Sequence, residues 1–252
     1  MPRKARAKSE TGIYHLMCRG INKQNMFEDE EDKQRFLETL AHYKNLSGYT
    51  LYGYCLMDNH VHLLIKENKE TIDQVIKRIS SSYVYWYNQK YQRCGHLFQE
   101  RYKSEVVETD EYFLMVLRYI HQNPVKAGIS KNIGRYLWSS YNNYVAMKGI
   151  ADIEYALKYF SNNKTEAIKL FIEYTNENNE DECLDCREKV IVTDQEVKKY
   201  LSEMGIRTIS QLQQLKKEQR DSVILNMKEK EGITIRQLAR ITGISKSVIA
   251  RL

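Results

Sequence analysis

The chain has 252 residues, of which 42% are hydrophobic and 29% charged, with a formal net charge of +6; this is enough for one sizeable domain and a smaller one. No apolar run approaches the ~20 residues that a membrane helix requires, and no hydrophobic signal core follows the basic start, so we expect a cytoplasmic protein without membrane contacts. Five widely spread cysteines, an odd number, exclude a disulfide framework.

The chain begins with a short basic arm that contains Arg3, Lys4 and Arg6. Such an arm can follow a DNA backbone, or it can be a solubilising tail, and the sequence leaves both open. The first predicted elements after it are a strand over residues 13–19 and a helix over about residues 30–46.

Residues 50–57 and 60–66 predict two strands that a tight turn joins into a hairpin. In the second strand, His60 and His62 are two residues apart and therefore project from the same face. Two neutral imidazoles this close can share one divalent metal ion. A histidine pair by itself is more often only part of a solvated strand face.

A long helix over about residues 71–91 and a strand over residues 102–107 are predicted next. The long helix is rich in aromatic residues. Tyr85, Tyr87 and Tyr91 could stack on unpaired nucleic-acid bases or could be ordinary surface and packing residues, and both interpretations remain open.

A further helix should begin after Thr109, a plausible N-cap. It should end near Asn123, because Pro124 disfavours helical geometry in the residue before it. Tyr119 and Asn123 are one turn apart on one face of this helix, where their side chains can meet. The chain has 19 tyrosines, so Tyr119 alone would carry little weight.

Residues 176–182 are polar, acidic and aperiodic, which predicts a linker. Residues 235–249 have the spacing of a helix-turn-helix, with Gly243 in the turn and Ser245 as the cap of the second helix. Such units bind duplex DNA or mediate protein contacts, and the pattern does not distinguish these roles. The residues that would face a DNA groove are Lys246, Ser247 and Arg251.

The order of elements, βαββαβ, is that of a ferredoxin-like α+β domain with an antiparallel sheet. We predict this domain over residues 1–150, a helical extension and acidic linker over residues 151–188, and an all-helical domain ending in the helix-turn-helix over residues 189–252. Residues 1–150 carry 22 basic and 16 acidic side chains, which is the whole positive excess, as expected of a domain that contacts phosphates.

Four sequence blocks in register resemble the single-tyrosine HUH transposases, which are named for their histidine–hydrophobe–histidine motif. The resemblance is strongest to the IS200-like and REP-associated tyrosine transposases and covers about residues 10–145. Asp58 departs from the family pattern, which usually has proline there; it could add a carboxylate near a metal or only change the entry to the strand. The blocks are residues 14–20, 57–64, 98–102 and 119–128.

The resemblance implies that Tyr119 is a nucleophile and that His60, His62 and Asn123 bind one Mg²⁺ or Mn²⁺. The expected reaction is cleavage and rejoining of single-stranded, hairpin-flanked DNA through a 5′-phosphotyrosine. Since the REP-associated branch tends to act alone, a monomer is favoured over a dimer. The matching blocks also suggest DNA contacts for Arg19, Gln99, Arg101 and Lys103.

Two other functions fit the same motifs. One is an HUH nickase that starts rolling-circle replication, although those enzymes usually place the tyrosine differently in the order of elements. The other is a catalytically retired transposase scaffold that regulates transcription through its helix-turn-helix. If the chain is an enzyme, the tyrosine needs help to ionise. A nearby cation could supply this help, and the sequence does not rank the candidates Arg118 and Lys126.

Overall fold

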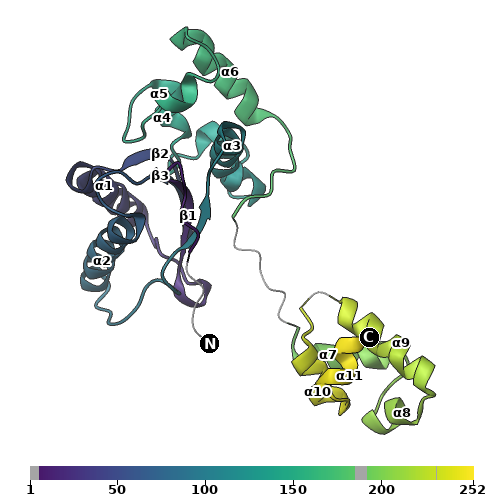
Figure 1. Ribbon diagram of the computed structural model, residues 1–252. Helices are drawn as coiled ribbons and strands as arrows, with labels where there is room; N and C mark the ends of the chain where they lie inside the picture. Colours follow the sequence, from purple (N-terminus) through teal and green to yellow (C-terminus); the bar gives the residue numbers. More distant parts are fainter. Residues whose placement is uncertain (1–5, 185–191, 231) are drawn as a thin grey trace. The chain divides into compact units, whose positions relative to one another are not determined.

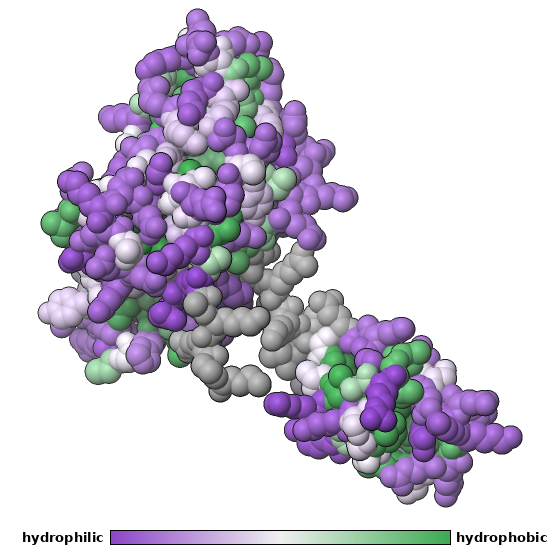
Figure 2. Space-filling view, in the orientation of Figure 1, coloured by the Kyte–Doolittle hydropathy of each residue, from purple (hydrophilic) through white to green (hydrophobic). Residues whose placement is uncertain are grey.

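The computed structural model describes residues 6–184, 192–230 and 232–252, so that Arg3 and Lys4 lie outside the described residues. The chain divides into two compact units, Met1–Asp185 and Cys186–Leu252 (Figure 1). The visible face of the first unit is largely hydrophilic (Figure 2). Within the described ranges, no helix is both long enough and apolar enough to cross a membrane.

The first unit is built on a four-stranded antiparallel sheet with the strand order β2-β3-β1-β4. The strands are β1 (Ile13–Arg19), β2 (Thr50–Met57), β3 (His60–Lys66) and β4 (Lys103–Val106). The predicted α+β class and antiparallel sheet are therefore confirmed, with strand ends within one residue of the predictions.

Two helices, α1 (Glu30–Ser47) and α2 (Ile72–Lys90), lie together on one face of the sheet (Figure 1). Their apolar residues at helical spacing, such as Phe36 and Val75, pack with alternate strand residues such as Leu16. The side chain of Asp29 caps α1 by accepting a hydrogen bond from the backbone N–H of Asp32.

The opposite face of the sheet is covered by α3 (Asp110–Lys126), which packs mainly against β2 and β3. Thr109 caps this helix as predicted, because its hydroxyl accepts a hydrogen bond from the backbone N–H of Tyr112 at 3.2 Å. Phe113 and Leu117 bury the apolar stripe of the helix against the sheet.

The prediction that this helix ends near Asn123 is wrong, because α3 continues through Pro124 to Lys126. Proline removes only one helical hydrogen bond, and here it does so in the last turn. The carbonyl of Asn123 still accepts from Ala127, and Val125 packs against the core on this side of the sheet. Burial of the last turn thus outweighs the local preference of the residue before proline.

The approach of α3 to the sheet depends on Gly53 in β2, where the strand register shifts. A Cβ atom added at Gly53 would lie 2.8 Å from Cδ1 of Leu117. We expect Gly53→Ala to lower the free energy of unfolding by about 1–3 kcal/mol, as measured by urea denaturation. Since alanine is intrinsically more favourable than glycine inside a strand, unchanged or higher stability would contradict this packing.

The remaining elements of the first unit are short helices after α3, together with one turn after β1. Phe171 and Tyr144 are buried in the core of this region, and their rings stack on each other. Residues 151–184 are therefore part of the first unit. The elements are η1 (Ile21–Lys23), η2 (Ile133–Arg135), α4 (Tyr141–Ala146), α5 (Glu154–Leu157) and α6 (Lys164–Asn176).

The second unit is helical throughout its assigned elements and has its own core, which includes Val197, Ile224 and Leu238. Gly243 ends α10 in the left-handed conformation, with φ of 72°, which turns the chain into α11. Ser245 lies at the N-cap of α11, as predicted, and its carbonyl accepts from the backbone N–H of Ile249. Its hydroxyl pairs with that of Ser247 at 3.1 Å and makes no capping bond. The helices are α7 (Asp194–Glu203), α8 (Ile209–Gln214), α9 (Lys217–Glu229), α10 (Ile235–Thr242) and α11 (Lys246–Arg251).

Candidate active site

The two histidines of β3 project from the sheet face that α3 covers. Strand alternation explains this placement, because Val61, Leu63 and Ile65 fill the core on the α1 and α2 side. The ring centroids of His60 and His62 are 5.1 Å apart. His62 is completely buried, whereas His60 is partly exposed.

α3 brings Tyr119 and Asn123 to the same place. The ring centroid of Tyr119 lies 5.7 Å from that of His62, and Nδ2 of Asn123 lies 3.3 Å from Nε2 of His62. Both side chains are largely buried. The structure therefore brings together all four residues that the sequence singled out, His60 included.

A third histidine, which the sequence analysis did not select, joins this group. His15 of β1 is fully buried, and its Nε2 lies 3.0 Å from Nδ1 of His62. The ring of Tyr119 lies 6.0 Å from that of His15. Strand alternation could have shown that His15 and Met17 share a face, but the pairing of β1 with β3 is not readable from one sequence.

Burial keeps these imidazoles neutral. It lowers the pKa of His15 to about 3, and it lowers the pKa of His62 well below its ordinary value, with smaller contributions from His15 and His60. A neutral imidazole has one nitrogen with an available lone pair, which is the form that binds metal ions.

The side chains at this place that could bind a divalent ion are the imidazoles of His60 and His62 and the amide of Asn123. In the part of the chain that the structure describes, no three His, Cys, Asp or Glu side chains form a possible metal cluster. Asp58 pairs with Lys33 of α1 at 2.8 Å. A donor set of His60, His62 and Asn123 would leave coordination positions open, unlike a closed structural zinc site.

The structure distinguishes the two candidate cations beside the tyrosine. Nζ of Lys126 lies 5.7 Å from the ring centroid of Tyr119 and donates a hydrogen bond to Asn179. Arg118 instead forms an ion pair with Asp181, in which Nε lies 2.8 Å from the carboxylate. Lys126 is therefore the cation better placed to act on the phenol.

Two predicted DNA contacts share the sheet face of the histidines. Arg19 is the β1 partner of His60, and Lys103 of the edge strand β4 pairs with Met17, which in turn pairs with His62. Lys103 is exposed, whereas Arg19 is partly buried.

The other predicted DNA contacts are distributed along the chain. Gln99 and Arg101 are exposed on the segment before β4, and the backbone N–H of Gln99 donates to the carbonyl of Arg19. Arg6 forms an ion pair within the first unit, in which Nη1 lies 2.8 Å from Oδ1 of Asp73. In the second unit, α11 exposes Lys246, Ser247 and Arg251.

The three aromatic candidates, two in α2 and Tyr91 at its C-cap, differ sharply in exposure. Tyr87 is buried and cannot stack on a base, and the hydroxyl of Tyr91 donates to Asp32 at 2.9 Å. Tyr85 alone of the three candidates is highly exposed, at 70%.

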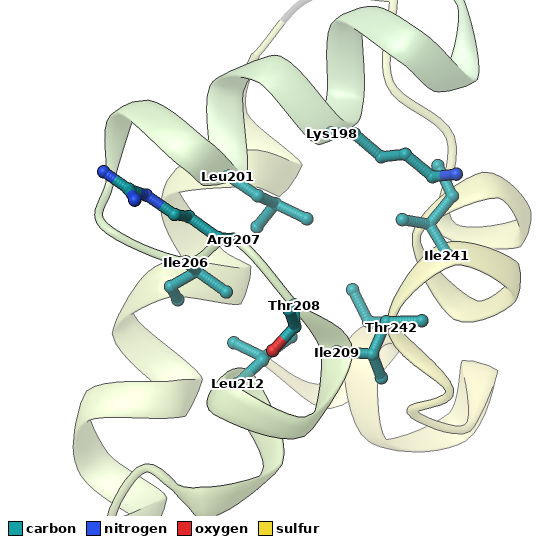
Figure 3. A pocket seen from close by; sticks show the side chains of 9 residues that line it. All are labelled: Lys198, Leu201, Ile206, Arg207, Thr208, Ile209, Leu212, Ile241 and Thr242. Atoms are coloured by element: carbon teal, nitrogen blue, oxygen red, sulfur yellow. The ribbon is translucent and has the colours of Figure 1, made fainter.

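A pocket of about 290 Å³ lies within the second unit (Figure 3). Apolar side chains form most of its wall, and its lining contains no histidine and no carboxylate. It therefore lacks the groups for acid–base or metal chemistry. The lining residues are Lys198, Leu201, Ile206, Arg207, Thr208, Ile209, Leu212, Ile241 and Thr242.

Comparison with known proteins agrees with this geometry. Residues 8–123 match the sequence model of the family described as "Transposase IS200 like". The fold is similar to the solved structure of a REP-associated tyrosine transposase bound to a REP hairpin, with a TM-score of 0.51 and 14% sequence identity over 58% of this chain and 86% of that chain. No curated protein matches the chain.

Proposed function

Residues 8–123 belong to the IS200-like transposase family, and on this basis we propose that the protein cleaves and rejoins single-stranded, hairpin-flanked DNA through a 5′-phosphotyrosine at Tyr119. The observation that carries the proposal is the position of Tyr119. Its ring centroid lies 5.7 Å from that of His62, and it is one helical turn from Asn123. The similar solved transposase is bound to a DNA hairpin, which supports the substrate class.

In the proposed reaction, the phenolic oxygen of Tyr119 attacks a backbone phosphorus atom in line with the departing deoxyribose 3′-oxygen. The new bond joins phosphorus to the tyrosine, the bond from phosphorus to the 3′-oxygen breaks, and that oxygen takes up a proton. The phenol gives its proton to water, water in turn supplies the proton of the 3′-hydroxyl, and the charge of Lys126 stabilises the phenolate.

Rejoining is the same displacement in reverse. A 3′-hydroxyl attacks the phosphotyrosine and releases Tyr119, so that the covalent link conserves the energy of the phosphodiester and ATP is not needed.

We assign His60, His62 and Asn123 as ligands of one Mg²⁺ or Mn²⁺. When bound, such an ion polarises the scissile phosphodiester and neutralises charge in the transition state. The neutral state of His62 favours metal binding. Among the residues that the structure describes, no set of carboxylates or thiolates closes the site, which favours open coordination positions.

The fold around this site supports a ferredoxin-like interpretation. The described elements run β1-α1-β2-β3-α2-β4, and both α1 and α2 lie on the sheet face away from the histidines. Arg19 and Lys103 lie on the face of the histidines and would contact the DNA backbone, with Gln99 and Arg101 beside them.

The basic arm is proposed as a further backbone contact, through Arg3, Lys4 and Arg6. Arg6 would have to leave Asp73 and the carbonyl of Tyr102 in order to do so.

We also propose a monomer. In dimeric relatives the tyrosine helices are exchanged between subunits. Here the ring of Tyr119 lies beside His62 of its own chain. A second subunit is therefore not required to complete the site.

The second unit is proposed to bind duplex DNA through α10 and α11 as a helix-turn-helix. Its described end, residues 232–252, carries four basic and no acidic side chains, and Lys246 and Arg251 are exposed. We expect Lys246→Ala with Arg251→Ala to reduce the salt dependence of duplex binding by about two units of slope, with strand cleavage unchanged. Fluorescence anisotropy across a salt series measures the slope, with exposed Lys217→Ala as the control. An unchanged slope would instead favour a protein-contact role.

The proposed reaction predicts which DNA end is attached to the protein. With Mn²⁺, a hairpin oligonucleotide labelled at its 3′ end should give a covalent band on denaturing gels, and the same oligonucleotide labelled at its 5′ end should not. EDTA should remove the band. A mobility shift without any covalent band would favour the regulator instead.

A further inference from the structure

The hydrogen bonds around His62 determine which of its ring nitrogens carries the proton. Nδ2 of Asn123, 3.3 Å from Nε2 of His62, is an amide nitrogen and can only donate. Nε2 must therefore accept, and the single proton of the neutral ring is on Nδ1. That nitrogen lies 3.0 Å from Nε2 of His15, which accepts from it.

The same logic continues through His15. Because Nε2 of His15 accepts, its own proton is on Nδ1, which has no hydrogen-bond partner and lies 4.0 Å from a carboxylate oxygen of Glu105. His15 is fully buried and neutral, so it cannot be a solvated surface histidine. The chain of contacts runs from β4 through β1 to β3.

An independent contact assigns a proton to Nδ1 of His60. Its Nδ1 lies 2.6 Å from Oδ1 of Asn59, and an amide oxygen can only accept. Nδ1 of His60 therefore donates, as Nδ1 of His62 does. In both rings the Nε2 lone pair therefore lies on the side away from the group that accepts the Nδ1 proton, and in His62 it faces Asn123.

We propose that His15 and Asn59 are positioning residues that hold His62 and His60 as their Nδ1–H tautomers, with Nε2 presented to the divalent ion. This inference rests on the metal site proposed above. Metal-binding histidines commonly donate their second ring N–H to such a partner, and its loss typically weakens metal binding by about 10- to 100-fold. Here His15 on β1 and Asn59 on the turn before β3 perform this role.

The tautomers can be measured without any metal. In the metal-free full-length protein labelled with ¹⁵N in its imidazole rings, long-range ¹H–¹⁵N spectra should show His60 and His62 protonated on Nδ1. His15→Leu should shift His62 toward the Nε2–H tautomer. His15→Gln, whose side-chain oxygen can replace the accepting nitrogen, should restore the Nδ1–H form.

Mn²⁺ affinity, measured by electron paramagnetic resonance, provides the second readout. We expect about a 10- to 100-fold loss for His15→Leu and a near-normal value for His15→Gln. His121→Gln is the matched control, because His121 is also fully buried but bonds to Ser140 rather than to His62. Its Mn²⁺ affinity should stay within a few-fold of the unaltered protein.

The outcomes separate this inference from the proposed function. If the unaltered protein binds no Mn²⁺, the metal site itself is refuted. If it binds Mn²⁺ but His62 carries its proton on Nε2, or if folded His15→Leu binds equally well, only the positioning role is overturned. Should His15→Leu fail to fold, Asn59→Ala tests the same role at His60, where the partner is on a turn.

Discussion

Tyr119→Phe should abolish covalent attachment of the protein to DNA, with a loss on the order of 10³-fold or more. The change removes only the attacking oxygen and keeps the ring that packs beside His15 and His62. Binding of the hairpin oligonucleotide should therefore remain nearly normal. Denaturing gels measure the adduct, and anisotropy at fixed salt measures the binding.

Tyr112→Phe is a matched control for this experiment, since Tyr112 is on the same helix about two turns earlier. It should leave adduct formation largely intact. A normal adduct yield in Tyr119→Phe would remove Tyr119 from the mechanism. An equal loss of DNA binding would instead indicate that the hydroxyl contributes to the fold or to the substrate surface.

Acidification should destabilise the first unit well before ordinary carboxylates are protonated. The pKa of His15 and of His121 is about 3 in the folded protein, and burial holds the pKa of His62 well below 6.5. In the unfolded chain these imidazoles bind protons near pH 6.5. Above pH 6.5 these imidazoles are neutral in both states, so their burial costs no stability through protonation. As the pH falls from 6.5 toward 3, the unfolded chain binds protons that the folded protein does not, and the free energy of unfolding decreases.

At pH 5.5 each of these histidines should lower the free energy of unfolding by about 1.4 kcal/mol. The three together should lower it by on the order of 4 kcal/mol. This corresponds to a fall of roughly 10 °C in the melting temperature of the first unit between pH 7.5 and pH 5.5. Calorimetry of the full chain in EDTA measures it. His121→Gln should reduce the fall by about a third, and equal melting temperatures at the two pH values would contradict neutral burial of these rings.

Much of the first unit could be predicted from the sequence because its signals are local. Strand alternation around His60-Val61-His62 predicts which side chains share a face, and Thr109 marks the start of α3 through its capping hydroxyl. The family prediction drawn from four short blocks is also confirmed, by the match over residues 8–123. These inferences needed only residue types and their spacing.

Other features depend on contacts between distant segments and could not be predicted. His15 joins the site only because β1 pairs with β3, and one sequence does not specify strand pairing. The end of α3 differs from the prediction because burial of the last turn outweighs the conformational preference of the residue before Pro124. The choice between Lys126 and Arg118 depended on Asp181, more than fifty residues further along the chain.

Peptide mapping of the covalent adduct tests the central claim most directly, because the chain offers 19 tyrosines as possible attachment points. After reaction with a hairpin oligonucleotide and Mn²⁺, nuclease trimming and proteolysis, mass spectrometry should find the nucleotide 5′-phosphate on Tyr119. The same nucleotide on another residue, or a cleaved oligonucleotide with no attached peptide, would contradict the account.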